Sequence, residues 1–241
     1  MRAVGVVENS AAAVAAGFAA GAHAVEVDVR LTADGVPVCV HDADLRRLAG
    51  MPVEVAGATR RELDEALLSA CGARIDRLVD VVGAVPGGGG LIVEIKHDGD
   101  ERPEHLVSTV VTTLAAAHPV DDLVVSSFSA AVLSEVRRQF PGIRRALVTP
   151  ADSTALAGLN EVLAWEHHEL HPHARSVMAQ PRVVDLARST GRVLRCWDVN
   201  RLVDARLLDV AGVSGVIVDD PGAMSDGLVR VPAPAVIGSA R

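Results

Sequence analysis

"VEVDVRLTADGVPVCVHD", residues 25–42, alternates valines with charged side chains through its first half. This period of two predicts a β-strand with one apolar and one polar face. Glu26 and Asp28 therefore lie on the same side of that strand, about 6–7 Å apart along the backbone. The Asp-Gly pair at 34–35 predicts a turn, and the extended run after it brings His41 back near the end of the strand. A solvated strand face would account for these charges, and so would a binding site.

Strands and helices alternate along the rest of the chain. Short runs rich in β-branched residues are expected to be strands at 24–30, 91–96, 123–128, 144–148, 162–170, 193–199 and 215–219. Stretches rich in Ala and Leu are expected to be helices at 10–21, 60–70, 75–85, 102–117, 130–139, 153–159, 180–189 and 203–210. This repetition predicts an α/β fold in which right-handed crossovers join parallel strands.

The pattern is that of a (β/α)8 TIM barrel with one element missing. A closed barrel of this kind needs eight parallel strands, whereas the count above gives seven and the first of them follows a helix. We therefore predict a barrel that lacks its first strand at the N-terminus. Residues 1–241 are expected to form a single domain, in which residues 42–85 supply a loop and helices between the second and third barrel strands and residues 231–241 form a loose tail.

Composition excludes several classes of protein. With 241 residues, 49% of them hydrophobic, the chain can bury a large core, and its net charge of -8 argues against general binding to nucleic acid. No apolar run is long enough for stable membrane insertion. The scattered cysteines Cys39, Cys71 and Cys196 are expected to be reduced and buried. We expect a cytoplasmic protein, a localisation that an upstream segment would change, and the oligomeric state is not indicated.

Charged residues also occur within a second expected strand. The run "LIVEIK" carries Glu94 and Lys96 two positions apart among apolar residues. Burying such charges is costly unless they are paired, bind a metal or face a cavity. Glu26 and Asp28 can converge on a hard cation, whose oxygen ligands lie about 2–2.6 Å away. His41 suits acid–base chemistry because its ordinary pKa is near neutrality.

Residues 26–42 resemble the signature E-x-D-V-x-x-T-x-D-G-x-x-V-x-x-H-D of the glycerophosphodiester phosphodiesterase family. Five further motifs stand in the family's order: "ENS" at 8–10, "VEIK" at 93–96, "VVSSF" at 124–128, "CWDVN" at 196–200 and "GVIVDDP" at 215–221. The resemblance implies a (β/α)8 barrel that uses a divalent cation, Mg²⁺ or Ca²⁺. It also implies hydrolysis of small glycerophosphodiesters to glycerol 3-phosphate and an alcohol.

The same resemblance assigns roles to individual residues. The implied metal ligands are Glu26, Asp28 and Glu94. His41 would be one of two catalytic histidines and would act on the leaving alcohol. Lys96 would lie near the substrate phosphate, and Trp197 would form a wall of the substrate pocket. The cation would neutralise phosphoryl oxygens and lower the pKa of an attacking hydroxyl or water.

The resemblance breaks down at the N-terminus. The family carries its other catalytic histidine and a phosphate-binding arginine in an H-R-G motif at the end of the first strand, whereas this chain opens "MRAVGVVENS". Arg2 is the candidate counterpart of that arginine, with Met1 at the histidine position. Either the true start lies upstream, which we favour, or the protein is a decayed paralogue. As printed, the chain is expected to turn over weakly, because losing one of a cooperating acid–base pair costs ~10²–10⁴-fold.

Two other functions agree with the same residues. One is a phosphodiesterase for lysophospholipids, which an apolar groove at the barrel mouth would favour. The other is a catalytically silent barrel that binds a phosphodiester or a metal as a sensor. Smaller departures from the family are Asp198 and Val218, which stand where it has threonine.

A histidine-rich segment, "WEHHELHPH" at 165–173, lies near the sixth barrel strand. It does not contain the H-E-x-x-H zinc motif. A transition-metal site, a wall of the substrate pocket and a solvated loop remain alternative interpretations. Arg47 has two interpretations as well, a phosphate contact or a surface salt bridge.

Overall fold

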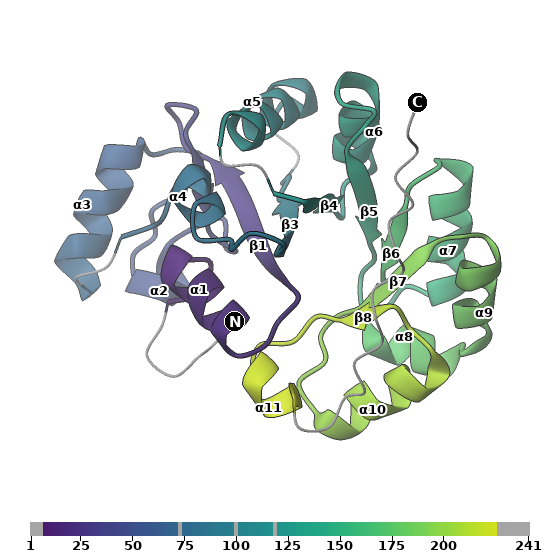
Figure 1. Cartoon of the computed structure of the whole chain (residues 1–241). Coiled ribbons are helices and arrows are strands. Elements are labelled where there is room, and N and C mark those ends of the chain that lie inside the picture. Colours follow the sequence, from purple (N-terminus) through teal and green to yellow (C-terminus); the bar gives the residue numbers. More distant parts are fainter. Residues whose placement is uncertain (1–6, 72–73, 99–100, 118–119, 226–241) are drawn as a thin grey trace.

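A curled β-sheet forms the centre of the molecule in the computed structural model, which describes residues 7–71, 74–98, 101–117 and 120–225 (Figure 1). Its strands are β1 (Ala24–Leu31), β2 (Pro37–Cys39), β3 (Gly90–Ile95), β4 (Asp122–Ser127), β5 (Arg144–Val148), β6 (Glu169–His171), β7 (Val193–Cys196) and β8 (Gly215–Val216). Their order is β2-β1-β3-β4-β5-β6-β7-β8, and every neighbouring pair is parallel except β1 and β2. The predicted α/β fold is confirmed.

Helices pack against the outer face of this sheet (Figure 1). They are α1 (Ala11–Ala19), α2 (Arg46–Ala49), α3 (Arg60–Cys71), α4 (Leu78–Val82), α5 (Pro103–Ala116), α6 (Ala130–Gln139), α7 (Ala155–Ala164), α8 (Ala174–Ala179), α9 (Arg182–Ser189), α10 (Leu202–Ala211) and α11 (Pro221–Ser225). Side chains of Ser10, Ser129 and Thr154 each accept a hydrogen bond from the backbone N–H three residues later, which fixes where α1, α6 and α7 begin. Aliphatic side chains fill the core between helices and sheet.

The hairpin between β1 and β2 returns the chain to the end of β1. Its turn needs a glycine, because Gly35 has φ +75°, a backbone conformation that other residues rarely adopt. The Thr32 hydroxyl accepts a hydrogen bond from the Val36 N–H at 2.9 Å and steadies the turn. After β2, the Val40 N–H donates to the carbonyl of Asp28 at 3.0 Å. The next residue, His41, is thereby held beside the carboxylate end of β1.

Within the residues that the structure describes, no strand joins β1 to β8. The described part of the chain supplies seven parallel strands, β1 and β3 to β8, and within it β1 does not pair with β8. This arrangement confirms the predicted (β/α)8 barrel without its first strand, since a closed barrel has eight. Parallel barrel strands carry functional side chains at their C-terminal ends, so the mouth near His41 and Trp197 is where a site is expected.

The predicted strand at 162–170 is wrong except for its last two residues. Helix α7 continues to Ala164, and Ala155, Leu159 and Val162 are buried at helical spacing against the sheet. The strand begins only at Glu169, after Glu166 has taken a left-handed backbone conformation with φ 54°. The run around Val162 was misleading because a short apolar run fits both the 3.6-residue period of a helix and the two-residue period of a strand. Helix α8 was not predicted.

Other expectations have mixed outcomes. Cys39 and Cys196 are free and buried, as predicted, whereas the Cys71 side chain lies outside the described part of the structure. Between β2 and β3, helices α2 to α4 and their loops enclose a small apolar cluster that includes Leu45 and Leu63. The predicted tail at 231–241 is also outside the described residues. Among the helices that the structure describes, none is long and apolar enough to cross a membrane.

Candidate active site

Three carboxylates meet at the mouth of the open barrel. Glu26 and Asp28 come from β1, and Glu94 comes from the adjacent strand β3, where it is the register partner of Asp28. One ligand oxygen from each of the three lies within 4.8 Å of the other two. The sequence prediction that these side chains converge is therefore met in the structure.

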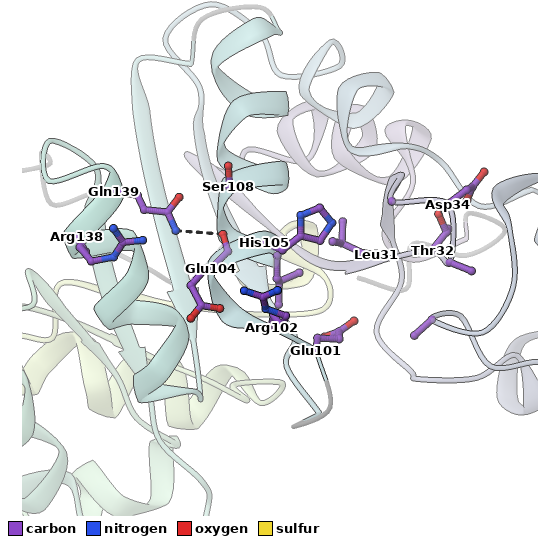
Figure 2. A pocket seen from close by; sticks show the side chains of 14 residues that line it. Leu31, Thr32, Asp34, Glu101, Arg102, Glu104, His105, Ser108, Arg138 and Gln139 are labelled. Carbon is purple, nitrogen blue, oxygen red and sulfur yellow. Dashed lines mark hydrogen bonds between the residues drawn. The ribbon is translucent and has the colours of Figure 1, made fainter.

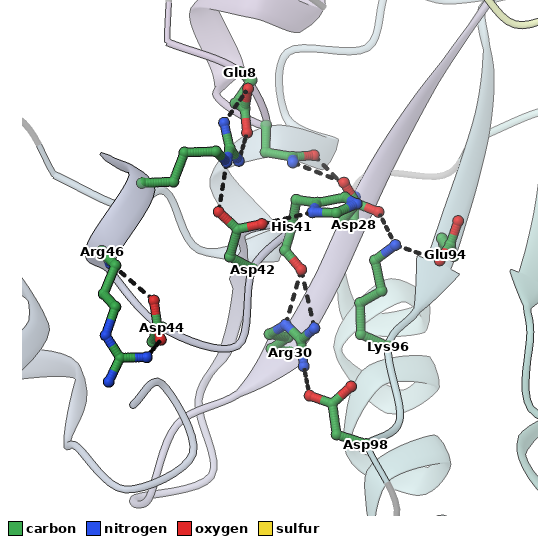
Figure 3. Close-up of polar contacts among 12 residues, drawn as sticks. Glu8, Asp28, Arg30, His41, Asp42, Asp44, Arg46, Glu94, Lys96 and Asp98 are labelled. Carbon is green, nitrogen blue, oxygen red and sulfur yellow. Dashed lines mark hydrogen bonds and ion pairs between the residues drawn. The ribbon is translucent and has the colours of Figure 1, made fainter. Parts of the chain in front are cut away.

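Lys96 lies between two of these carboxylates (Figure 3). Its Nζ is 2.8 Å from Oδ1 of Asp28 and 2.5 Å from Oε1 of Glu94, and all three side chains are nearly buried. Lys96 is the only lysine among the 23 lysines and arginines of the sequence. A compact ammonium fits between two carboxylates where a planar guanidinium would need more room.

Asn9 fixes the orientation of Asp28, a role that sequence reasoning did not predict. Its Nδ2 donates to Oδ2 of Asp28 at 2.9 Å, and its Oδ1 accepts from the Asp28 backbone N–H at 2.9 Å. The second bond satisfies a strand N–H at the open edge of β1. The signal was present in "ENS" at 8–10, which the sequence analysis treated only as a family motif, with no role for Asn9.

The electrostatics of this acidic centre favour an added positive charge. Burial raises the pKa of Glu26 well above its ordinary value, and the charges of Asp28 and Glu94 raise it further. Burial also raises the pKa of Glu94, although Lys96 opposes this shift. Burial alone would lower the pKa of Lys96, but the charges of Asp28 and Glu94 outweigh it and the pKa is raised. Three carboxylates against one ammonium leave two negative charges uncompensated.

The donor set fits one hard divalent cation. Oε1 of Glu26 is buried and has no hydrogen-bond partner among the described residues, so this oxygen lacks a compensating contact. Two oxygens that each lie about 2.0–2.6 Å from one ion cannot be more than roughly 5.2 Å apart, a condition that the cluster satisfies. An all-oxygen ligand set suits Mg²⁺ or Ca²⁺ better than zinc.

His41 lies at the rim of the acidic centre and is held from both sides (Figure 3). Its Nδ1 is 2.8 Å from Oδ1 of Asp42, and Arg30 donates from Nε and Nη2 to the His41 carbonyl at 3.0 Å each. Arg47 pairs with Asp42 at 2.6 Å and also with Glu8, which agrees with the salt-bridge interpretation of Arg47. The imidazole is more than half exposed, so its Nε2 is open to an incoming group.

A cavity of about 1110 Å³ joins the acidic centre to the aromatic residues of the mouth. Phe128 and Trp197 line it with their rings edge to face, 5.9 Å apart, and the Nζ of Lys96 is 5.8 Å from the Phe128 ring centre. The Trp197 indole N–H donates to the His171 carbonyl at 3.1 Å. Trp197 therefore forms part of the cavity wall.

The histidine-rich segment divides between core and cavity. His171 lines the cavity. Its Nε2 is 3.0 Å from Oε2 of Glu169, and the Glu169 side chain is fully buried. His167 is buried elsewhere, and burial lowers its pKa to about 4. The acidic centre is the one metal-type cluster found within the described residues, so the zinc interpretation receives no support. The solvated-loop interpretation is wrong for His167 and His171.

A second hollow, of about 1170 Å³, lies away from this centre (Figure 2). It is bounded by the turn after β1, including Asp34, by Glu101 just before α5, and by His105 in the first turn of α5. Burial raises the pKa of Glu101. This hollow contains none of the three clustered carboxylates.

The remaining candidates have structural roles or lie outside the structure. Arg2 falls outside the described residues. Nδ2 of Asn200 donates to Oδ2 of Asp219, and the Asp219 backbone N–H donates to Oδ1 of Asn200. Asp220 accepts from the Ala223 N–H at the start of α11. Asn200 also bonds to Asp198, which stands in the family's threonine position.

Comparison with known proteins agrees with this geometry. The sequence model of the Glycerophosphoryl diester phosphodiesterase family matches residues 2–223. A glycerophosphodiester phosphodiesterase of Caldanaerobacter subterraneus subsp. tengcongensis is 28% identical over 227 residues, covering 90% of each chain. A probable glycerophosphodiester phosphodiesterase 1 of Mycobacterium tuberculosis is 31% identical over 89% of this chain and 85% of its own.

Solved structures show the same fold. A glycerophosphodiester phosphodiesterase of Thermotoga maritima superposes with a TM-score of 0.76 at 26% identity, covering 92% of each chain. A phosphodiesterase of Oleispira antarctica, in complex with the product sn-glycerol-3-phosphate, gives a TM-score of 0.81 at 23% identity over 91% of this chain and 90% of its own.

Proposed function

Because the chain belongs to the glycerophosphoryl diester phosphodiesterase family, we propose that it hydrolyses glycerophosphodiesters to glycerol 3-phosphate and an alcohol. The observation that carries the proposal is the meeting of Glu26, Asp28 and Glu94 in one cavity with Lys96 and His41. A cluster of three carboxylates beside an ammonium and an exposed imidazole matches what phosphodiester cleavage needs, namely charge neutralisation and proton transfer. The Oleispira relative, crystallised with sn-glycerol-3-phosphate, supports a small-molecule substrate of this kind.

Each of these residues has a distinct task. Glu26, Asp28 and Glu94 would hold one Mg²⁺ or Ca²⁺, and this cation would supply charge neutralisation of the phosphoryl oxygens. Lys96, already 2.8 Å from Asp28, places its charge beside the substrate phosphate. Trp197 forms the wall against which the organic part of the substrate rests.

His41 gives a proton to the leaving alcohol. Asp42 accepts from its Nδ1 at 2.8 Å, so Nε2 is the nitrogen that faces the substrate. Arg30, through the His41 carbonyl, keeps the backbone in place.

Hydrolysis of glycerophosphocholine, followed as release of glycerol 3-phosphate, tests the proposal. Activity is expected with Mg²⁺ or Ca²⁺, and is expected to disappear with a chelator and in Asp28→Asn. His41→Asn is expected to lose ~10²–10⁴-fold in kcat. Glu65→Gln is the matched control, because Glu65 is an exposed carboxylate on α3 that pairs only with Arg61 among the contacts described. Hydrolysis that survives both the chelator and Asp28→Asn contradicts the proposal.

The same assay separates the two alternatives. A lysophospholipid phosphodiesterase would cleave the substrate with an acyl chain and leave the deacylated one intact. A sensor barrel would bind Mg²⁺ or Ca²⁺ in calorimetry without cleaving either substrate.

A further inference from the structure

The barrel cavity contains a second imidazole that the proposed function does not yet use. Among the described residues that line it, the histidines are His23, His41 and His171. His23 precedes β1 at the end of the strand opposite to His41, so it is remote from the mouth. His171 is the last residue of β6, which puts it at the end of a strand where functional side chains of this fold gather.

A buried charge network holds the His171 ring. Its Nε2 is 3.0 Å from Oε2 of Glu169, and the same oxygen is 2.9 Å from Nη1 of Arg195 on β7. Arg144 on β5 pairs with the other Glu169 oxygen and lies 2.5 Å from Asp122 on β4. Two guanidinium groups and two carboxylates balance, so the network is neutral as long as the imidazole is uncharged.

This balance decides the protonation state of the ring. The pKa of Glu169 is lowered: burial would raise it, but the hydrogen bond from His171 and the charge of Arg195 outweigh burial. The pKa of His171 is also lowered, first by burial, while Glu169 opposes the shift and the charges of Arg195 and Arg144 add to it. A neutral imidazole beside an ionised carboxylate carries its hydrogen on Nε2. The lone pair of Nδ1 is then free to accept a proton.

We propose that His171, which lines the same cavity as His41, is a second proton-transferring residue of this active site, oriented by Glu169 and acting as a general base. The inference rests on the proposed phosphodiesterase function and supplies the base which that function requires. A carboxylate that fixes an imidazole and then stabilises its protonated form is the arrangement used wherever histidine serves as a base.

The proton balance of the step is closed. A water oxygen forms a bond to phosphorus, and its proton passes to Nδ1 of His171. The bond from phosphorus to the alcohol oxygen breaks, and Nε2 of His41 protonates that oxygen. Glycerol 3-phosphate and the alcohol leave, and solvent returns the proton from His171 to His41. The other charged groups that line the cavity are Glu8, Glu26, Asp28, Asp42, Arg47, Glu94, Lys96, Asp122, Arg195, Asp198, Asp209 and Asp219.

Kinetics of two substitutions at one position test the inference. His171→Asn and His171→Gln remove the base and keep a polar side chain, and each is expected to lower kcat by ~10²-fold or more while Ca²⁺ affinity stays unchanged. In the wild type, kcat is expected to rise with pH on the acidic side of its pH profile. This rise is expected to disappear in both His171 variants. His167→Asn is the matched control, because His167 is equally buried in the same segment but does not line the cavity.

A second measurement does not depend on turnover. In ¹⁵N-detected imidazole spectra, His171 is expected to show a protonated Nε2 and an unprotonated Nδ1, whose resonance shifts when glycerol 3-phosphate is added. Wild-type kcat and pH profile in the His171 variants, or an Nδ1 resonance unmoved by saturating glycerol 3-phosphate, overturns the inference. If His41→Asn abolishes hydrolysis while the His171 variants do not affect it, the inference fails and the proposed function stands. Absence of hydrolysis in the wild type, with intact glycerol 3-phosphate binding at His171, would instead remove the proposed function.

Discussion

Replacing Lys96 by methionine tests the charge balance of the acidic centre. The ammonium lies 2.8 Å from Asp28 and 2.5 Å from Glu94, and the three side chains are only 13%, 10% and 11% exposed. Removing one member of a buried ion pair typically costs about 3–5 kcal/mol, because the partner charge is left buried without compensation. Since domains of this kind are stable by about 5–15 kcal/mol, Lys96→Met is expected to lose a large fraction of the free energy of unfolding in the absence of cations.

A divalent cation should reverse much of this loss. Lys96 competes with the cation for the same two carboxylates, so its removal raises cation affinity. A ligand at 100 times its Kd adds about 2.7 kcal/mol to the free energy of unfolding, and a tighter site at equal concentration adds more. The destabilisation by Lys96→Met is therefore expected to be smaller in saturating Ca²⁺ than in EDTA.

Urea unfolding followed by circular dichroism, with EDTA or with Ca²⁺, measures both quantities. Arg77→Met is the control: it removes a positive charge from an exposed pair with Asp80, whose contribution is at most about 1 kcal/mol. An unchanged midpoint for Lys96→Met in EDTA, or a loss that is the same with and without Ca²⁺, refutes the reasoning.

Two further predictions follow from neighbouring residues. Glu26 has a raised pKa in the folded protein, so its contribution to stability is present below about pH 4.5 and is lost as the pH rises through its folded pKa. Glu26→Gln is accordingly expected to flatten the fall in stability above pH 4.5 in cation-free urea titrations; a fall as steep as that of the wild type would rule this out. Asn9→Ala removes both hydrogen bonds that orient Asp28. Cation affinity in calorimetry is expected to drop about 10–100-fold, as for other groups that support a metal ligand, and an unchanged Kd would show that Asp28 needs no such support.

Local patterns predicted the parts of the site that are continuous in sequence. The alternation around Glu26 and Asp28, and the turn at Gly35, sufficed to place two carboxylates and His41 together. The placement of Glu94 required one further step, the pairing of two parallel strands in register. Each of these features depends on residues a few positions apart or on adjacent strands.

The Glu169 network could not be predicted in the same way. Its partners Arg144 and Arg195 come from β5 and β7, and which side chains meet depends on the register of three strands at once. In the sequence, Glu169 was one charge in a histidine-rich run whose strand boundary was itself misassigned. Asn9 was missed for a related reason, because a residue at a helix start that also binds a strand edge has no pattern of its own.

The claim on which the rest depends is that three acidic side chains from β1 and β3 share one cation. A crystal soaked in Mn²⁺ and measured at an anomalous wavelength tests this directly. We expect a single strong peak within about 2.0–2.6 Å of carboxylate oxygens of Glu26, Asp28 and Glu94, and none in crystals of Asp28→Asn. A peak bound elsewhere, with these three carboxylates left uncoordinated, would contradict the account.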